Sequence, residues 1–170
     1  KLFFSTAQVL ILGERLSQDG IEEVLDFFQR DQEIDYTMDV LVAKGTTPRE
    51  VLEMGNDMDS IPAVYIRELA KNTAWRGTVK RTLLIELFKD MGCNGKQLAI
   101  GQISKAGDGE VGTEGMAVFK DGKLAGWLNS YETRGYLFAT DEVKSTIVNI
   151  PADTGKIAME IIRSKGKIDV

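Results

Sequence analysis

Apolar residues recur along the first hundred positions with two different spacings, and these predict strands alternating with helices. Short apolar runs at residues 8–12 and 36–43 predict two strands, and residues 98–104 predict a third. From Val9 onward the first of these runs is continuously apolar, which is typical of a central strand covered on both faces.

Four segments between these runs carry the spacing of a helix. Asp19 as N-cap and Glu22 three positions later predict a helix that ends near Arg30, with a stripe of Ile21, Val24, Leu25 and Phe28. Thr47, Pro48 and Glu50 predict the start of a short helix that ends near Gly55. Ser60 predicts the cap of a helix over residues 61–72, and a leucine-rich stripe predicts another over 78–91, ended by Gly92.

A glycine-rich acidic segment, residues 105–115, separates this half from the rest and is the best candidate boundary between two domains. It contains Gly107, Gly109 and Gly112 with the spacing of a dinucleotide-binding loop. That loop requires a helix after its last glycine, whereas here a strand follows and acidic side chains surround the glycines. We therefore expect no cofactor at this loop.

The next segment predicts a β-hairpin over residues 115–128. Asp121 and Gly122 suit the positive φ angles of a type I′ turn. A regular two-residue turn opposes Lys120 to Lys123, Phe119 to Leu124, Val118 to Ala125, Ala117 to Gly126 and Met116 to Trp127. Residues 131–140 predict only a short helix or turn, because Gly135 interrupts the pattern, and residues 145–150 and 156–163 predict two strands.

These elements predict an α+β fold in two parts. Residues 1–105 form a mixed sheet with packed helices, and residues 106–170 form a mainly antiparallel β unit that contains the hairpin. The order of the strands does not follow from the sequence.

Composition excludes several classes of chemistry. The chain has 170 residues, a net charge of −5, no histidine and a single cysteine, Cys93. Catalytic triads and zinc sites built on histidine are excluded, as is an intrachain disulfide. The acidic balance argues against nucleic acid as a partner.

The hairpin also carries a sequence signature. The segment from Gly115 to Leu128 reads GMAVFKDGKLAGWL and is followed by Glu132 and Gly135. It resembles the signature of the Ger(x)C family, the C-subunit lipoproteins of spore germinant receptors. Residues 9–14, 20–21, 26–31 and 41–45 resemble that family in the same order. The signature residues are Gly115, Ala117, Val118, Phe119, Lys120, Lys123, Leu124, Gly126, Leu128, Glu132 and Gly135.

The resemblance implies a non-catalytic subunit that acts with membrane-embedded A and B subunits in nutrient-triggered germination. It implies a lipid anchor on the outer face of the inner spore membrane, outside this chain, and no cofactor. It also implies that a preceding segment and a third, C-terminal domain of the family are absent here. An absent preceding segment would leave a sheet edge open, which favours strand swapping or homo-oligomers.

Two other functions stay open. The acidic loop and the aromatic residues Trp75, Trp127 and Tyr131 are compatible with a module that binds a small molecule such as the germinant. A hydrolase that uses paired carboxylates needs no histidine, and Glu22, Glu23 and Asp26 cluster on one predicted helix. The solvated face of a helix explains that cluster more simply, and a structural hydrogen bond explains Glu132.

One cluster is a candidate contact with a partner. It consists of three cations, Arg76, Lys80 and Arg81, around Trp75 beside a predicted helix start. In an acidic protein such a cluster can face lipid head groups or an acidic protein surface.

Overall fold

A five-strand path forms the centre of the molecule. The computed structural model describes residues 5–31, 33–54, 61–93, 95–107, 109–143, 145–152, 155–162 and 164–165. The strands β1 (Val9–Leu12), β2 (Asp39–Ala43), β4 (Ala99–Lys105), β6 (Met116–Lys120) and β7 (Lys123–Leu128) lie in the order β1-β2-β4-β6-β7. The first three are parallel, and β6 and β7 are antiparallel to their neighbours. Two short strands, β3 (Thr82–Leu83) and β5 (Val111–Gly112), pair with β2 and β4.

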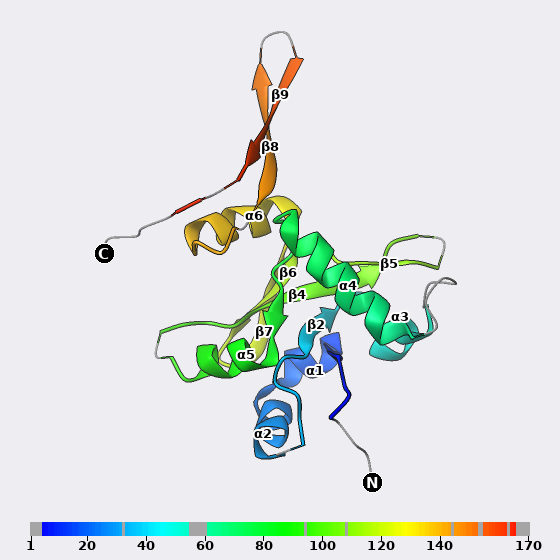
Figure 1. The fold of residues 1–170 in the computed structure, drawn as a ribbon. Coiled ribbons are helices and arrows are strands. Elements are labelled where there is room, and N and C mark those ends of the chain that lie inside the picture. The colour runs from blue at the N-terminus through cyan, green and yellow to red at the C-terminus, as the bar shows by residue number, and fades with distance from the viewer. Residues whose placement is uncertain are drawn as a thin grey trace.

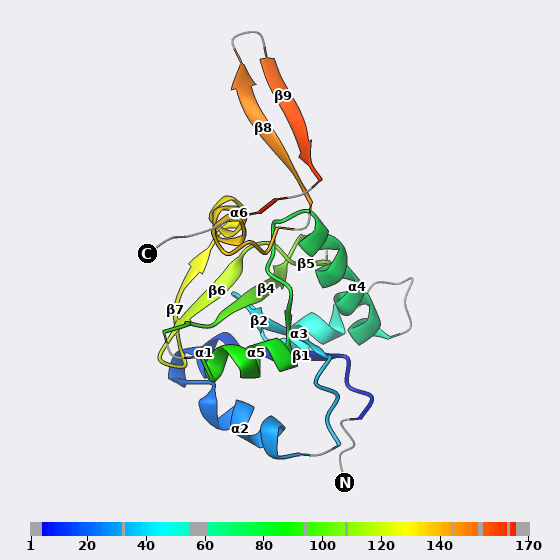
Figure 2. The same cartoon turned by 60° about the vertical axis from the view of Figure 1, so that its left-hand side comes forward.

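Helices cover both faces of this sheet (Figure 1). On one face α2 (Glu22–Arg30) and α5 (Leu84–Met91) bury Leu25, Leu84 and Leu87 against Val40, Ile100 and Phe119. On the other, α3 (Pro48–Glu53) and α4 (Pro62–Trp75) bury Val51, Ile66 and Ala70 against Leu41 and Ile103. Figure 2 shows this layering from a second side. The α+β prediction is confirmed.

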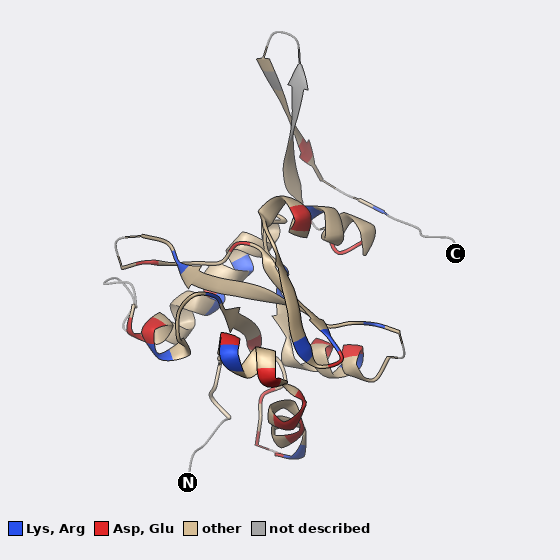
Figure 3. Cartoon of the chain, turned by 180° about the vertical axis from the view of Figure 1, so that it is seen from behind, with Lys and Arg blue, Asp and Glu red and all other residues tan. Residues whose placement is uncertain are grey.

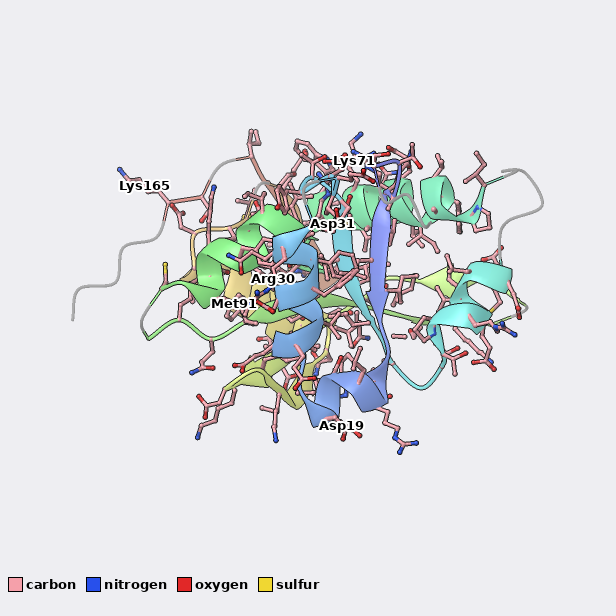
Figure 4. All side chains as sticks on the ribbon, turned by 90° about the horizontal axis from the view of Figure 1, so that it is seen from below. Asp19, Arg30, Asp31, Lys71, Met91 and Lys165 are labelled. Atoms are coloured by element: carbon pink, nitrogen blue, oxygen red, sulfur yellow. The ribbon has the colours of Figure 1, made fainter. Side chains whose placement is uncertain are left out.

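The remaining elements lie at the ends of the sheet. The short helix α1 (Glu14–Asp19) packs beside β7, and α6 (Ser130–Ala139) follows β7 in the chain. Seen from below in Figure 4, Asp19 lies at the end of α1 and Arg30 and Asp31 at the far end of α2. The strands β8 (Thr146–Ala152) and β9 (Gly155–Ile161) form a separate antiparallel hairpin that projects from the body (Figures 1 and 2).

Three helix predictions need correction. The helix predicted from Asp19 to Arg30 begins only at Glu22 with Ile21 as N-cap, because residues 14–19 form α1, which we did not predict. The helix predicted over 78–91 starts at Leu84, since the residues before it run extended along β2 and β4. Gly135 does not interrupt its segment, which is the ten-residue helix α6.

Other helix boundaries agree closely with the prediction. Thr47 caps α3 with Pro48 in the first turn, and its hydroxyl accepts from the Glu50 N–H while the Glu50 carboxylate accepts from the Thr47 N–H. The helix predicted over 61–72 is present as α4 and runs three residues further. The predicted Ser60 cap and the end near Gly55 lie outside the described residues.

The predicted pairing of residues in the hairpin is correct next to the turn and wrong further from it. Asp121 and Gly122 have φ angles of 51° and 71°, as a type I′ turn requires, and Lys120 pairs with Lys123 and Phe119 with Leu124. An irregularity between Val118 and Phe119 then shifts the pairing by one, so that Ala117 opposes Trp127 and not Gly126. A bulge of this kind moves every later side chain relative to a regular hairpin.

The sheet continues across the predicted boundary at residue 105. Strand β4, before the boundary, pairs with β6 after it through Ala99 and Val118, Ile100 and Ala117, and Gly101 and Met116. Residues on both sides of position 105 therefore share one sheet. The division into domains at 105 and 106 stays a prediction.

Candidate functional site

A cleft of about 440 Å³ lies where the end of α4, the following extended segment, α5 and the end of α6 meet. We call it the junction cleft. Its walls carry charged side chains of both signs beside apolar side chains. It is lined by Lys71, Ala74, Trp75, Val79, Lys80, Arg81, Thr82, Leu83, Glu86, Lys89, Asp90, Lys96, Leu137, Asp141, Glu142 and Val143.

One wall depends on a buried carboxylate. The side chain of Asp39, at the start of β2, is 1% exposed and accepts two hydrogen bonds from Arg81, from Nε at 2.6 Å and from Nη2 at 3.0 Å. Arg67 Nε on α4 lies 3.6 Å from the same carboxylate. The hydrogen bond to Asp39 raises the pKa of the Arg81 guanidinium, although partial burial opposes the rise. Two-pronged pairing of this kind fixes the arginine in one orientation.

A second ion pair joins the segment after α4 to the end of α6. The Nζ of Lys80 donates to a carboxylate oxygen of Glu142, which follows α6, and the Lys80 side chain is only 8% exposed. The same Nζ lies 5.8 Å from the centroid of the Tyr136 ring. Burial, followed by the charge of Glu142, raises the pKa of the Tyr136 hydroxyl. These contacts hold the end of α6 against the extended segment.

Two glycines allow that segment to lie directly on the sheet. A Cβ on Gly101 would lie 2.4 Å from the Lys80 carbonyl oxygen. A Cβ on Gly115 would lie 2.4 Å from the Leu128 carbonyl oxygen, and Gly115 has a φ of 88°. The Gly115 N–H donates to the Thr78 carbonyl at 2.7 Å, so this signature glycine is where three segments meet.

The projecting hairpin is attached to the same segment. The hydroxyl of Thr146, the first residue of β8, donates to the Arg76 carbonyl at 2.8 Å. A Cβ on Gly77, whose φ is 67°, would lie 3.3 Å from the Thr146 side chain. Residues 76–82 therefore touch the base of the hairpin, the end of α6 and the central sheet.

The four residues of the candidate partner contact divide into two pairs. Trp75 is 54% exposed, and Arg76 is also exposed. Lys80 is buried and Arg81 half-buried, and both form ion pairs within the chain. The structure thus brings all four to one region and leaves Trp75 and Arg76 at its surface.

Three partners in this region were not predicted. Asp39, Tyr136 and Glu142 are far from Lys80 and Arg81 in the sequence, by 42 to 62 positions for the two ion pairs. The sequence carried a partial signal for Asp39, because an aspartate within an apolar strand needs a cationic partner if the strand is buried. No comparable signal marked Glu142.

The remaining signature residues lie in the hairpin and at its exit. Ala117 and Phe119 are buried in the core, whereas Lys120 and Lys123 are exposed on either side of the turn. Val118, Leu124, Gly126 and Leu128 are half-buried. Glu132 completes the cap of α6, since its carboxylate accepts from the Asn129 N–H at 2.9 Å while Asn129 caps the helix.

Acidic residues gather elsewhere on the molecule. Figure 3 shows them on α2, at the opposite end of the molecule from the β8–β9 hairpin. On this helix Asp26 pairs with Arg30 at 2.8 Å. The side chain of Glu22 lies so close to the hairpin turn that a Cβ on Gly122 would be 2.7 Å from its Oε1. Among the described residues no three acidic or cysteine side chains are grouped as a metal site, and no helix has the length and apolar content that a bilayer crossing requires.

Comparison with known proteins agrees with this fold. Residues 1–105 match the family model described as "Spore germination protein N-terminal domain", and residues 114–170 match "Spore germination B3/ GerAC like, C-terminal". These two matches place the chain in the class of spore germination proteins. The chain belongs to the Ger(x)C family.

Two curated relatives come from Bacillus subtilis (strain 168). The chain is 26% identical to spore germination protein KC over 92% of its own length and 42% of that protein. It is 23% identical to the putative spore germination protein YfkR over 94% of its length and 43% of that protein. The chain thus spans less than half of each relative. The crystal structure of the GerBC protein has the same fold, with a TM-score of 0.64, 22% identity and coverage of 95% of this chain and 46% of that one.

Proposed function

We propose that this chain is part of a germinant receptor C subunit that acts without catalysis, together with A and B subunits, in nutrient-triggered germination of endospores. The observation that carries the proposal is the succession of two spore germination family models, which match residues 1–105 and 114–170 of one chain. A lipid anchor would hold the subunit at the outer face of the inner spore membrane.

The surface beside the junction cleft is the proposed contact with the receptor partners. Trp75 is 54% exposed, Arg76 lies next to it, and Lys89 on the cleft wall is exposed as well. An exposed tryptophan beside cations suits a protein interface, where tryptophan and arginine are enriched. The ion pairs of Lys80 and Arg81 hold the segment that presents these two residues.

A complementation experiment tests this function in the full-length protein of the source organism. Spores lacking the gene should lose nutrient-triggered germination, and the unsubstituted protein should restore it and co-purify with A and B subunits. The pair Trp75→Ala and Arg76→Glu should abolish both the rescue and the co-purification. Arg49→Glu is the matched control, because the Arg49 side chain is 86% exposed on α3, away from the cleft. Normal rescue by the double variant would overturn the contact, and normal germination without the gene would overturn the function.

A small-molecule site is the second candidate, and the volume of the cleft favours it. About 440 Å³ lies within the range of pockets that hold small ligands, and the walls offer both cations and carboxylates. A ligand with both charges, such as a free amino acid, would find partners there. Isothermal titration of the chain with amino acids, simple sugars and inosine separates this candidate from the first. A heat of binding in the unsubstituted chain that disappears in Lys89→Glu would support a ligand site in the cleft. No heat with any of these compounds would argue against the ligand site and in favour of the subunit contact.

A further inference from the structure

Two guanidinium groups share one buried carboxylate beside the junction cleft. Asp39, whose side chain is 1% exposed, lies 2.6 Å from Arg81 Nε and 3.6 Å from Arg67 Nε. Two positive charges against one negative charge leave these three side chains with a net charge of +1. Of the two arginines, Arg81 lines the cleft. The excess positive charge therefore borders the cleft through Arg81.

The guanidinium of Arg81 has donors left for a ligand. Arginine carries five N–H donors in one plane, and Asp39 accepts one from Nε and one from Nη2. Among the described residues none accepts from Nη1, and the Arg81 side chain is 28% exposed. The N–H groups at the outer end of the plane, on Nη1 and Nη2, match the two oxygens of a carboxylate. Arg81 can therefore hold a second carboxylate while it keeps the first.

The pairing with Asp39 also prepares this guanidinium for binding. Two hydrogen bonds to a buried carboxylate hold the Arg81 side chain in one orientation before any ligand arrives. A ligand that binds to a side chain already held in place loses less free energy to ordering.

Other charges that line the cleft have partners within the chain. Glu142 accepts from Lys80, and Asp90 lies 2.6 Å from Lys96. The ammonium of Lys89, which also lines the cleft, forms no ion pair with a described residue. The free hydrogen-bonding capacity of the cleft is therefore cationic, on Arg81 and Lys89.

The apolar part of the cleft suits the body of a small organic molecule. Val79, Leu137 and Val143 line it, and all three are buried aliphatic side chains. The volume of about 440 Å³ lies in the range of pockets that hold small ligands. A carboxylate on an aliphatic body would match both the cations and the apolar side chains.

We propose that the junction cleft binds a small organic carboxylate, whose two oxygens accept from Nη1 and Nη2 of Arg81 while its aliphatic body lies against Val79, Leu137 and Val143. This inference rests on the second candidate of the proposed function, the ligand site, and names the class of its ligand. It does not depend on the subunit contact.

Three probes of one shape test the class of ligand. Isothermal titration of the unsubstituted chain uses 4-methylpentanoate, its neutral amide 4-methylpentanamide and the cation 4-methylpentylamine. The carboxylate should bind with a Kd of about 1 mM, and the amide about tenfold more weakly, because it loses the charge-assisted hydrogen bonds. Equal binding of carboxylate and amide, or preference for the amine, would overturn the carboxylate and leave a ligand site. Absence of binding by all three would overturn the site as well.

Substitution of Arg81 tests the contact itself. Arg81→Lys keeps a positive charge beside Asp39 but loses the paired donors, so it should weaken binding of 4-methylpentanoate about tenfold. Arg67→Lys is the matched control, because Arg67 also lies beside Asp39 but does not line the cleft. Its affinity should equal that of the unsubstituted chain, and far-UV circular dichroism checks that both variants are folded. Equal losses in the two variants would contradict the contact.

Glu86→Gln tests the proposal without disturbing the buried ion pair. Glu86 lines the cleft, and its Oε2 accepts from the Leu83 N–H at 2.9 Å, a hydrogen bond that glutamine can also accept. The variant removes a negative charge from the cleft, so 4-methylpentanoate should bind about threefold more tightly. Unchanged or weaker binding would overturn the proposal.

Co-purification separates a free carboxylate from an acidic side chain of a partner protein. In the full-length protein, Arg81→Lys should leave co-purification with A and B subunits unchanged. Its loss, together with no binding of 4-methylpentanoate by the unsubstituted chain, would assign the carboxylate to a partner and overturn the small-ligand site.

Discussion

The Nζ of Lys80 donates to Glu142 across 62 positions of sequence and joins the regions that match two different family models. The two partners differ in exposure, with the Lys80 side chain at 8% and the Glu142 side chain at 32%. Removing one partner should therefore lower the free energy of unfolding more than removing the other. The larger loss is expected when Glu142 is removed, because the more deeply buried charge of Lys80 then stays behind.

Glu142→Ala should lower the free energy of unfolding by about 3 kcal/mol, because it leaves the Lys80 ammonium buried without its carboxylate. Lys80→Met should cost clearly less, since methionine replaces the apolar stem and water can reach Glu142. Urea denaturation of both variants provides the comparison. A Lys80→Met loss equal to or larger than that of Glu142→Ala would contradict this asymmetry.

Gly115→Ala should be among the most damaging changes to the sheet. Its Cβ would lie 2.4 Å from the Leu128 carbonyl oxygen at a φ of 88°. Backbone strain and overpacking together cost about 3 kcal/mol or more. Gly126→Ala in β7 is the control, because its nearest atom is Val118 Cγ2 at 3.9 Å. Thermal denaturation should show a large loss for the first variant and a change below about 1 kcal/mol for the second; similar losses would refute the steric explanation.

Gly135→Ala should stabilise the protein. Gly135 lies inside α6 without positive φ, and apart from its chain neighbours and the backbone of its own helix no atom lies within 4 Å of the position of its Cβ. Alanine in a helix interior gains about 0.5–1 kcal/mol over glycine. The melting temperature should therefore rise, and a fall would show that the site is more crowded than the structure indicates.

Acid should weaken the start of α3 through Glu50. Hydrogen bonds from the Thr47 N–H and from the hydroxyls of Thr46 and Thr47 lower the pKa of Glu50 from 4.5 to about 2. Because the folded pKa lies below the unfolded value, the stabilisation is complete above pH 4.5 and disappears as the pH falls through 2. The difference in melting temperature between the unsubstituted chain and Glu50→Gln should shrink as the pH is lowered from 7 to 2. Glu53→Gln, which removes only a 4.0 Å contact with Arg49, should leave the pH profile unchanged.

The sequence predicted correctly those parts of the fold that depend on residues close together in the chain. The capping residues of α3 and the turn at Asp121 and Gly122 act within three or four positions, so their outcomes could be predicted. The start of α5 could not, because residues 78–83 have helical spacing but lie extended on the sheet over Gly101. There tertiary contact overrides local preference.

The candidate site shows the same division between local and distant determinants. The grouping of Trp75, Arg76, Lys80 and Arg81 was visible in the sequence because the residues are adjacent. Which of them face solvent depended on Asp39 and Glu142, whose positions follow from the packing of β2 and α6. The displaced register beyond Phe119 likewise required a bulge that no single residue indicates.

Photocrosslinking at position 75 of the full-length protein tests the central claim most directly. A photoreactive phenylalanine analogue in place of Trp75 keeps an aromatic ring at this 54% exposed position. Irradiation of dormant spores should give a crosslinked species that contains an A or B subunit, and the same analogue at Arg49 should give none. Crosslinking from position 49 but not from position 75 would contradict the proposed contact beside the junction cleft.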